Sequence, residues 1–189
     1  MITGTPGAGK TSTSRLLASR MDAKLVELGE LIEKEKLFSG YDKRRGTLIA
    51  NMRRISERIQ EIIANSDRDL IIVGHFAAEV IPRREVHLLF VLRRDPEELK
   101  VILEKRGFKE GKVWENIAAE VLDVCLWDAI NLFDKDKVCE INVTGREVEE
   151  VVEEIISILN MEKECRCGWI DWLGKLDAEG KIDEFLKHF

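Results

Sequence analysis

Residues 4–11 read G-T-P-G-A-G-K-T and fit the pattern G-x-x-x-x-G-K-[ST] at each position. β-prone residues come before this stretch, and a helical pattern follows it at residues 10–21. A strand, a glycine-rich turn and a helix in that order are typical of a P-loop, whose backbone N–H groups and helix N-terminus hold phosphate. Because only Met1, Ile2 and Thr3 precede the motif, we expect either that its strand is very short or that one or two residues are missing from the start of the chain.

The residue types in this stretch predict individual roles. Glycines such as Gly7 and Gly9 let the backbone turn its N–H groups inward as an anion nest. Lys10 is expected to reach the β- and γ-phosphates of a nucleotide, Thr11 to offer its hydroxyl to Mg²⁺, and Ser12 to donate to the α-phosphate. A turn that only opened a helix would not call for Lys and Thr at its end. The sequence therefore predicts binding of a purine nucleoside triphosphate with Mg²⁺.

The rest of the chain alternates short apolar runs with helical patterns. We expect strands at residues 24–28, 70–74, 87–92 and 137–143, and helices at residues 29–38, 47–64, 96–106, 112–132 and 147–159. Asp95 before Pro96 reads as a helix N-cap, and Thr144 with Glu147 as a capping box. Such alternation predicts an α/β fold of three layers, a doubly wound parallel sheet covered by helices on both faces.

Composition narrows the classes of protein that need to be considered. The 189 residues carry a net charge of −6, which argues against non-specific nucleic-acid binding by the whole surface. A local basic run could contact phosphate or RNA, or simply be a solvated helix face. Its members are Lys43, Arg44, Arg45, Arg53, Arg54 and Arg58.

Location and redox state follow from what the sequence lacks. It shows no signal peptide and no apolar run long enough to span a bilayer, so we expect a cytoplasmic protein that does not enter membranes. In that compartment Cys125, Cys139, Cys165 and Cys167 are expected to be reduced thiols. The C-x-C pair has too few neighbouring ligands to suggest a metal site.

The chain divides near residue 160. Residues 1–160 carry the P-loop and the alternating elements, and residues 161–189 form what we expect to be a C-terminal helical extension. Trp169, Trp172 and an amphipathic segment at residues 182–189 give the extension an apolar face. We favour docking of this face on the domain itself over binding of a partner, because large exposed apolar patches are uncommon on monomers.

Guanine-binding switches require an N-K-x-D motif that is not found here, and motor and transporter ATPases carry other signatures and lengths. A small P-loop chain with basic residues after the second strand therefore suggests a small-molecule phosphotransferase. Further motifs make the chain resemble the adenylate kinase isoenzyme 6 family in its archaeal form, also described as small-subunit ribosome biogenesis ATPases. These motifs are G-Y-D (residues 40–42), G-H (74–75) before Pro82, F-V-L-R (90–93), R-G-F (106–108) and E-N-I-x-x-E (115–120).

This resemblance implies a nucleoside-monophosphate kinase-like core with an acceptor segment at about residues 30–53 and a short lid at about residues 105–115. Members of the family are described as transferring phosphate from ATP to AMP, as hydrolysing ATP, and as binding the ribosomal protein uS11 during small-subunit maturation. ATP, Mg²⁺, AMP or another nucleoside monophosphate, uS11 and pre-ribosomal RNA are therefore the expected cofactors and partners.

The resemblance also points to individual residues. Arg106 matches the lid arginine expected over ATP, and His75 matches a histidine associated with hydrolysis, through water or metal. Arg54, which follows the acceptor segment, is a candidate ligand of the AMP α-phosphate, and Arg93 is a candidate substrate ligand because it ends a strand, where ligands of parallel sheets bind. The chain departs from the family at Val73, where an acidic residue normally helps to hold Mg²⁺ through water, and this departure predicts weak metal binding or slow turnover.

Two hypotheses from different classes remain open at this point. The first is a nucleoside-monophosphate kinase, favoured by the basic acceptor segment. The second is an assembly factor whose nucleotide state controls a ribosomal protein and whose kinase activity is incidental, favoured by Val73. Phosphate transfer to another small acceptor is a further alternative, because the identity of the acceptor rests on resemblance.

Overall fold

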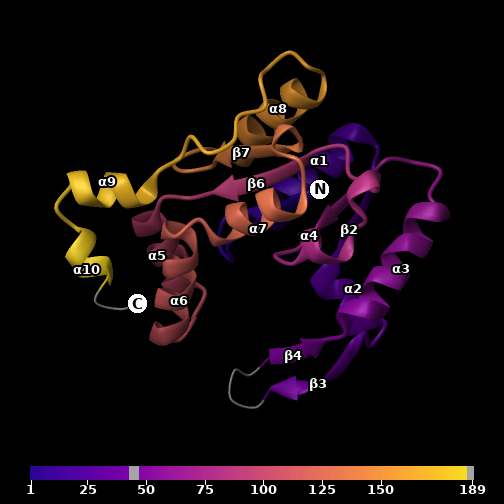
Figure 1. Ribbon diagram of the computed structural model, residues 1–189, viewed down its shortest axis with the longest axis horizontal. Coiled ribbons are helices and arrows are strands. Elements are labelled where there is room, and N and C mark those ends of the chain that lie inside the picture. Colours follow the sequence, from indigo (N-terminus) through magenta and orange to yellow (C-terminus); the bar gives the residue numbers. More distant parts are fainter. Residues whose placement is uncertain (43–46, 187–189) are drawn as a thin grey trace.

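A computed structural model describes residues 1–42 and 47–186 (Figure 1). Within these residues, five strands form a parallel sheet in the order β2-β5-β1-β6-β7, and β3 and β4 form a separate antiparallel pair. The strands are β1 (Ile2–Gly4), β2 (Lys24–Glu27), β3 (Phe38–Asp42), β4 (Thr47–Ala50), β5 (Leu70–Val73), β6 (Leu89–Arg93) and β7 (Val138–Asn142). The α-helices are α1 (Lys10–Met21), α2 (Leu28–Lys34), α3 (Met52–Ala64), α4 (Ala77–Val80), α5 (Pro96–Lys105), α6 (Glu110–Val121), α7 (Val124–Leu132), α8 (Val148–Leu159), α9 (Trp172–Ala178) and α10 (Ile182–Leu186).

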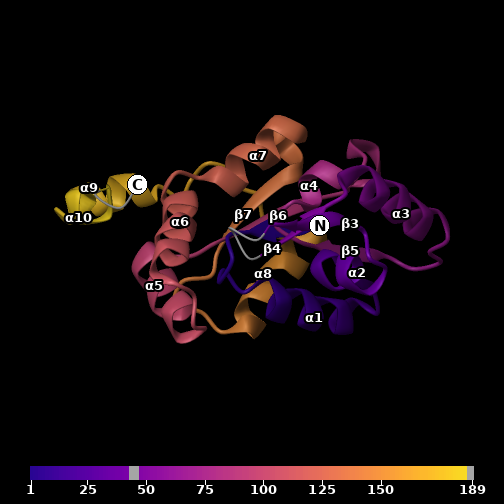
Figure 2. The same cartoon turned by 90° about the horizontal axis from the view of Figure 1, so that it is seen from below.

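The sheet is apolar on both faces, and helices cover both. Helices α1 and α8 lie on one face of the sheet (Figure 2). Leu17 of α1 and Val152 of α8 share an apolar cluster with Ile2 of the central strand. Helices α3, α4 and α7 lie on the other, where Ile59 and Ala129 belong to a second apolar cluster. The three-layer α/β fold with a parallel sheet is thus confirmed. Its central strand β1 lies between β5 and β6, and open sheets of this kind bind ligands outside the carboxyl ends of such strands.

A third apolar cluster lies beside the sheet and includes the C-terminal segment. Leu103 of α5 and Ile117 of α6 pack there with Leu176 of α9 and Phe185 of α10, all of them buried. Ion pairs of Lys175 with Asp95 and Lys181 with Glu97 add charge complementarity between α9–α10 and the start of α5. The apolar face of the last segment is therefore packed against α5 and α6.

At residues 38–50 the structure differs from the helices expected there. Where helices were expected over residues 29–38 and 47–64, α2 ends at Lys34 and the hairpin of β3 and β4 precedes α3. Helix α3 begins only at Met52, where the Asn51 side chain caps it by accepting from the backbone N–H of Arg54 at 3.2 Å. The run from Thr47 to Ile49 is rich in strand formers, which explains the hairpin. Lys43, Arg44 and Arg45 of the basic run lie outside the described residues.

The helix expected over residues 112–132 is two helices. Asp123 between α6 and α7 has a φ of 56°, a left-handed conformation that ends the first helix. The break directs the Asp123 carboxylate and the Glu120 carbonyl oxygen to the buried Arg93 guanidinium, which donates to both. The ion pair and the hydrogen bond at this break compensate for the helical bonds that are lost.

Of the two predicted helix caps, the cap of α5 is confirmed and that of α8 is wrong. Asp95 caps α5 by accepting from the N–H groups of Glu97 and Glu98, as expected. The capping box of α8 is instead formed by Glu147 and Glu150, three positions later than expected. The Thr144 hydroxyl accepts from the Asp95 N–H at 2.8 Å, so this threonine links two loops at the carboxyl edge of the sheet.

The expectation of four reduced thiols is wrong for two of them, because Cys139 and Cys165 form a disulfide. After α8 the chain returns alongside β7, where the Glu140 N–H donates to the Arg166 carbonyl oxygen at 2.8 Å. That return brings the two cysteine Cα atoms to 5.0 Å from each other despite a sequence separation of 26. Cys125 and Cys167 are free thiols.

None of the helices within residues 1–42 and 47–186 combines the length and the apolar character that a membrane span requires.

Candidate nucleotide-binding site

The loop between β1 and α1 has a backbone that only glycine tolerates. Gly4, Gly7 and Gly9 have φ values of 138°, 95° and 90°, in the region that side chains disfavour. A Cβ atom on Gly4 would lie 2.5 Å from the Leu92 carbonyl oxygen of β6, and one on Gly7 would lie 2.6 Å from Leu99 Cδ1 of α5. Strand β6 and helix α5 therefore fix the shape of the loop by direct contact.

The lysine of the motif folds back over this loop. Lys10 Nζ donates to the carbonyl oxygens of Gly4 at 2.7 Å and Thr5 at 3.1 Å. Burial lowers the pKa of Lys10 to about 8, against the opposing influence of Cys125 and Glu120. An ammonium group held this way is poised to bind an anion that enters the loop.

The first turn of α1 carries exposed hydroxyl groups. Thr11 and Ser12 are both exposed there, next to backbone N–H groups that no helical carbonyl can satisfy. Val73 lies 5% exposed in an apolar cluster at the end of β5, so this position supplies no carboxylate to a metal. Among the described residues, no group of three or more His, Cys, Asp or Glu side chains could hold a metal ion. The exposed Thr11 hydroxyl is a donor that would fit a magnesium ion carried by phosphate oxygens and water.

Two arginines bring further positive charge to the loop. Arg94 directly follows β6, and its NH2 atom lies 3.5 Å from a Cβ built on Gly9. Arg106 follows α5, and its charge lowers the pKa of both Lys10 and Arg94. Lys10 and Arg94 thus lie at the N-terminus of α1, where the helix dipole also favours an anion, and the charge of Arg106 acts on both.

Arg93, expected to bind the substrate, lies in a different environment. It is 1% exposed, and it donates to Glu120 at 2.8 Å, to Glu140 at 2.6 Å and to Asp123. Burial disfavours its charge, but the three carboxylates raise its pKa. Its guanidinium has carboxylate partners on every nitrogen, so the expectation of a substrate ligand does not fit this structure.

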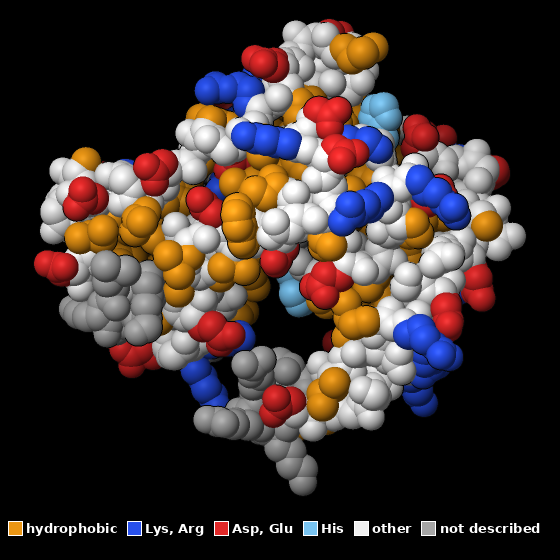
Figure 3. Space-filling view, in the orientation of Figure 1, with side chains coloured by type: hydrophobic (Ala, Val, Ile, Leu, Met, Phe, Trp, Pro, Cys, Tyr) orange, Lys and Arg blue, Asp and Glu red, His pale blue; other side chains and the backbone are white. Residues whose placement is uncertain are grey.

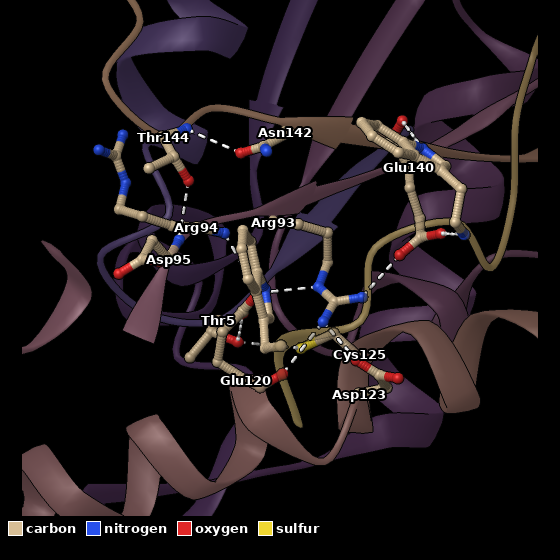
Figure 4. Close-up of polar contacts among 12 residues, drawn as sticks. Thr5, Arg93, Arg94, Asp95, Glu120, Asp123, Cys125, Glu140, Asn142 and Thr144 are labelled. Carbon is tan, nitrogen blue, oxygen red and sulfur yellow. Dashed lines mark hydrogen bonds and ion pairs between the residues drawn. The ribbon is translucent and has the colours of Figure 1, made fainter. Parts of the chain in front are cut away.

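Glu120 connects the loop with the sheet and with α9 (Figure 4). Its carboxylate accepts from the Thr5 hydroxyl at 2.5 Å and from the Arg94 backbone N–H at 3.1 Å, besides Arg93. It also accepts from the indole N–H of Trp172 at 3.0 Å. Sequence reasoning gave no role to Glu120 or Arg94. The E-N-I-x-x-E pattern, which ends at Glu120, was the signal available for the glutamate.

His75 lies just beyond β5, close to the lysine. Its backbone carbonyl oxygen accepts from the Thr3 hydroxyl at 3.3 Å, and its ring meets Phe76 edge to face with centroids 4.4 Å apart. Burial lowers the pKa of His75, and the charges of Lys10 and Lys112 lower it further. The imidazole is therefore held neutral near the anion-binding loop, where it can accept or relay a proton.

Arg54 lies apart from this group, on α3 after the hairpin. Its NH1 atom donates to the Lys36 carbonyl oxygen at 3.2 Å, and the side chain is exposed. The space-filling view shows the molecule hollowed between α5–α6 and the β3–β4 hairpin (Figure 3). The structure thus brings Lys10, His75 and Arg106 to the loop and leaves Arg54 on the hairpin side.

Sequence comparison finds relatives over most of the chain. A family model described as an AAA domain matches residues 1–123. A protein of Methanocaldococcus jannaschii with the name "Putative adenylate kinase" is 40% identical over 174 residues, 92% of each chain. A protein of the same name from Methanothermobacter thermautotrophicus is 37% identical over 175 residues, 93% of this chain and 97% of its own.

Comparison with solved structures concerns the fold alone. A shikimate kinase from Acinetobacter baumannii, in complex with shikimate, superposes with a TM-score of 0.59 at 13% identity, over 86% of this chain and 92% of its own. A deoxyadenosine kinase from M. mycoides does so with a TM-score of 0.52 at 13% identity, over 85% of this chain and 97% of its own. The resemblance expected from the sequence motifs is confirmed: the chain belongs to the archaeal adenylate kinase family that its relatives form, and its residues 1–123 match the family described as an AAA domain.

Proposed function

We propose that the protein is a nucleoside-monophosphate kinase that transfers the γ-phosphate of ATP to AMP. The position of Lys10 and Arg94 at the N-terminus of α1, with the charge of Arg106 acting on both, carries this proposal. Phosphoryl transfer is catalysed chiefly by positioning and by neutralising charge, which is what such a group of cations provides. The choice of ATP and AMP is supported by the names of relatives up to 40% identical.

The reaction needs little acid–base chemistry from the protein. The AMP phosphate is largely ionised at neutral pH because its second pKa is about 6. One of its oxygens forms the new bond to the γ-phosphorus, while the bond from that phosphorus to the β–γ bridging oxygen breaks, so that two ADP molecules result. Bound Mg²⁺ would neutralise charge on the β- and γ-phosphates. Thr11 would be its protein ligand.

The remaining residues divide between donor and acceptor. The backbone N–H groups around Gly7 and Gly9, with Ser12, hold the donor phosphates, and Lys10 reaches their outer end. Arg106, in the proposed lid at residues 105–115, closes over ATP and excludes water. Arg54, which follows the proposed acceptor segment at residues 30–53, binds the AMP phosphate once it releases the Lys36 carbonyl oxygen. His75 orients the acceptor or a water molecule as a neutral imidazole.

Steady-state kinetics with a panel of acceptors tests this proposal. ATP and Mg²⁺ are supplied with AMP, CMP, GMP, UMP or shikimate, and ADP formation is followed. We expect AMP to give the highest kcat/KM and Lys10→Ala to abolish turnover. Faster turnover with another acceptor would identify that compound, and not AMP, as the substrate. ADP formation at the same rate with and without any acceptor would contradict the assignment as a kinase.

A second candidate is favoured by one observation, the buried Val73 at the end of β5. Without a carboxylate there, ATP turnover can be slow, and slow hydrolysis suits an ATPase whose nucleotide state controls the release of a ribosomal protein such as uS11 from precursor RNA. The same panel separates the two candidates. Slow hydrolysis that is indifferent to AMP but stimulated by a basic ribosomal protein would favour the assembly factor.

A further inference from the structure

Strand β6 ends at Arg93, Arg94 directly follows it, and the two side chains point in different directions. Arg93 points into the buried carboxylates, whereas the Arg94 side chain leaves the strand in a different direction (Figure 4). The Arg94 NH2 atom lies 3.5 Å from a Cβ built on Gly9 of the phosphate loop. Strand geometry explains the divergence, because successive side chains point to opposite faces.

Arg94 is held in place, but its hydrogen-bonding capacity is not used up. Its NH1 atom pairs with Glu98, one turn into α5, and Glu98 in turn accepts from the Gly145 N–H at 2.9 Å. The side chain is 13% exposed. Among the described residues, Arg94 Nε is a buried side-chain donor without a hydrogen-bond partner. Buried donors are almost always satisfied, so this N–H calls for a ligand.

The unused part of the guanidinium has the geometry of an oxyanion receptor. The Nε and NH2 atoms lie on the same edge of the planar group, and arginine uses such an edge to bind phosphate through two parallel hydrogen bonds. Glu98 occupies the opposite NH1 atom, which leaves the Nε–NH2 edge free toward the loop.

The charges around Arg94 point the same way. Burial lowers the pKa of Arg94, and the neighbouring Arg106 lowers it further. Lys10 adds a third cation at the loop, and its own pKa is lowered to about 8, mainly by burial. Bringing positive charges together is costly in the empty protein, and an entering anion would relieve that cost.

We propose that Arg94 is a phosphate ligand of the donor nucleotide and that it binds through its Nε–NH2 edge. This proposal rests on the proposed function in one respect, because it requires that the phosphate chain of a nucleotide enters the loop. Arg94 thereby adds a fixed cation at a site whose β5 end provides no acidic ligand for Mg²⁺.

Titration calorimetry with three probes tests the proposal without any turnover. ADP and inorganic tripolyphosphate present a phosphate chain, whereas AMP reports on the acceptor side. The variant is Arg94→Gln, which keeps a long polar side chain but removes the charge and the fork. Arg84→Gln is the matched control, because Arg84 is exposed, pairs with Glu85 and precedes the amino end of β6. We expect Arg94→Gln to weaken the binding of ADP and of tripolyphosphate at least tenfold and to change the affinity for AMP less than twofold.

Thermal unfolding separates this role from a structural one. Because Arg94 Nε is unsatisfied and faces like charge, the nucleotide-free Arg94→Gln protein should unfold no earlier than the wild type. Unchanged ADP and tripolyphosphate affinity, or an equal loss for AMP, would overturn the proposal. If Arg94→Gln does not fold, Arg94→Lys must give the same selective loss, since it keeps the charge without the fork. A different outcome would be ADP binding that depends on Arg94 in a wild type that does not phosphorylate AMP. That result would refute the kinase assignment and leave the role of Arg94 intact.

Discussion

Thr5 of the phosphate loop donates a hydrogen bond to Glu120 of α6, with 2.5 Å between the two oxygens. The same carboxylate accepts from Arg93 and from Trp172, so the loop, the edge of the sheet and the C-terminal segment share one buried acidic group. The shape of the loop therefore depends on residues that lie outside the motif by which it is recognised.

Replacing Arg93 by methionine should destabilise the protein severely. The side chain would keep much of its volume but leave the buried Glu120 and Glu140 carboxylates without their cation. Breaking a buried pair in this way costs about 3–5 kcal/mol. Urea unfolding of Arg93→Met measures the loss, and the exposed Arg84→Met serves as control. A stable Arg93→Met protein with weakened AMP binding would restore the substrate role that the structure argues against.

Gly4→Ala should distort the phosphate loop. The new methyl group would lie 2.5 Å from the Leu92 carbonyl oxygen, and alanine disfavours the φ of 138° found there. We expect a loss of about 2 kcal/mol or more in unfolding free energy, together with weaker ADP binding. Gly111→Ala on α6 is the matched control because its Cβ would meet nothing within 4 Å. That variant should be stabilised slightly, by about 0.5–1 kcal/mol. Equal effects of the two changes would contradict the described loop.

The affinity for ADP should fall as pH rises above 8. Burial lowers the pKa of Lys10 to about 8 in the free protein, and a bound phosphate would raise it again. Between these two values, binding takes up a proton, so affinity should fall by up to about tenfold per pH unit. Calorimetry from pH 7 to 9.5 measures this slope, and Lys10→Met should lack it. If the affinity for ADP changes with pH equally in the wild type and in Lys10→Met, the effect belongs to a group other than Lys10.

The ionisation of Lys10 should make the free energy of unfolding rise with pH, whereas the affinity for ADP falls. Its folded pKa of about 8 lies below the ordinary value of 10.5, so the unfolded chain binds more protons between these pH values. Unfolding free energy should therefore rise with pH over this window in the wild type relative to Lys10→Met. A wild type that loses stability relative to the variant would show that the ammonium is not buried.

Reduction of the Cys139–Cys165 disulfide should weaken the fold. The bond closes a loop with a sequence separation of 26 residues, and such a cross-link contributes about 3 kcal/mol by restricting the unfolded chain. Dithiothreitol should lower the unfolding free energy of the wild type and leave Cys165→Ser unchanged. Cys167→Ser is the control, because Cys167 is a free thiol two positions away. A wild type insensitive to dithiothreitol would contradict the bond.

The sequence made the sheet and the loop predictable, because their signals are local. Apolar runs located β5, β6 and β7, and the glycine spacing located the turn into α1. The β3–β4 hairpin was not predictable in this way, since its short strands have a pattern that also fits the ends of helices. The break at Asp123 was hidden as well, because neither glycine nor proline marks it.

The site was predictable only in part, for a reason of strand geometry. Strand β6 is buried along its whole length, so its apolar run shows no alternation that could tell which of Arg93 and Arg94 faces the loop. Long-range partners were equally out of reach. Glu120 lies 115 positions from Thr5, and Cys165 meets Cys139 only because the chain returns alongside β7.

The fate of the γ-phosphate tests the kinase assignment most directly. ATP labelled with ³²P at the γ position is incubated with Mg²⁺, unlabelled AMP and the protein, and the products are separated by chromatography. We predict that label appears in ADP at a rate that requires AMP and is abolished in Lys10→Ala. Label that appears only as inorganic phosphate, at a rate indifferent to AMP, would contradict phosphate transfer to a nucleoside monophosphate.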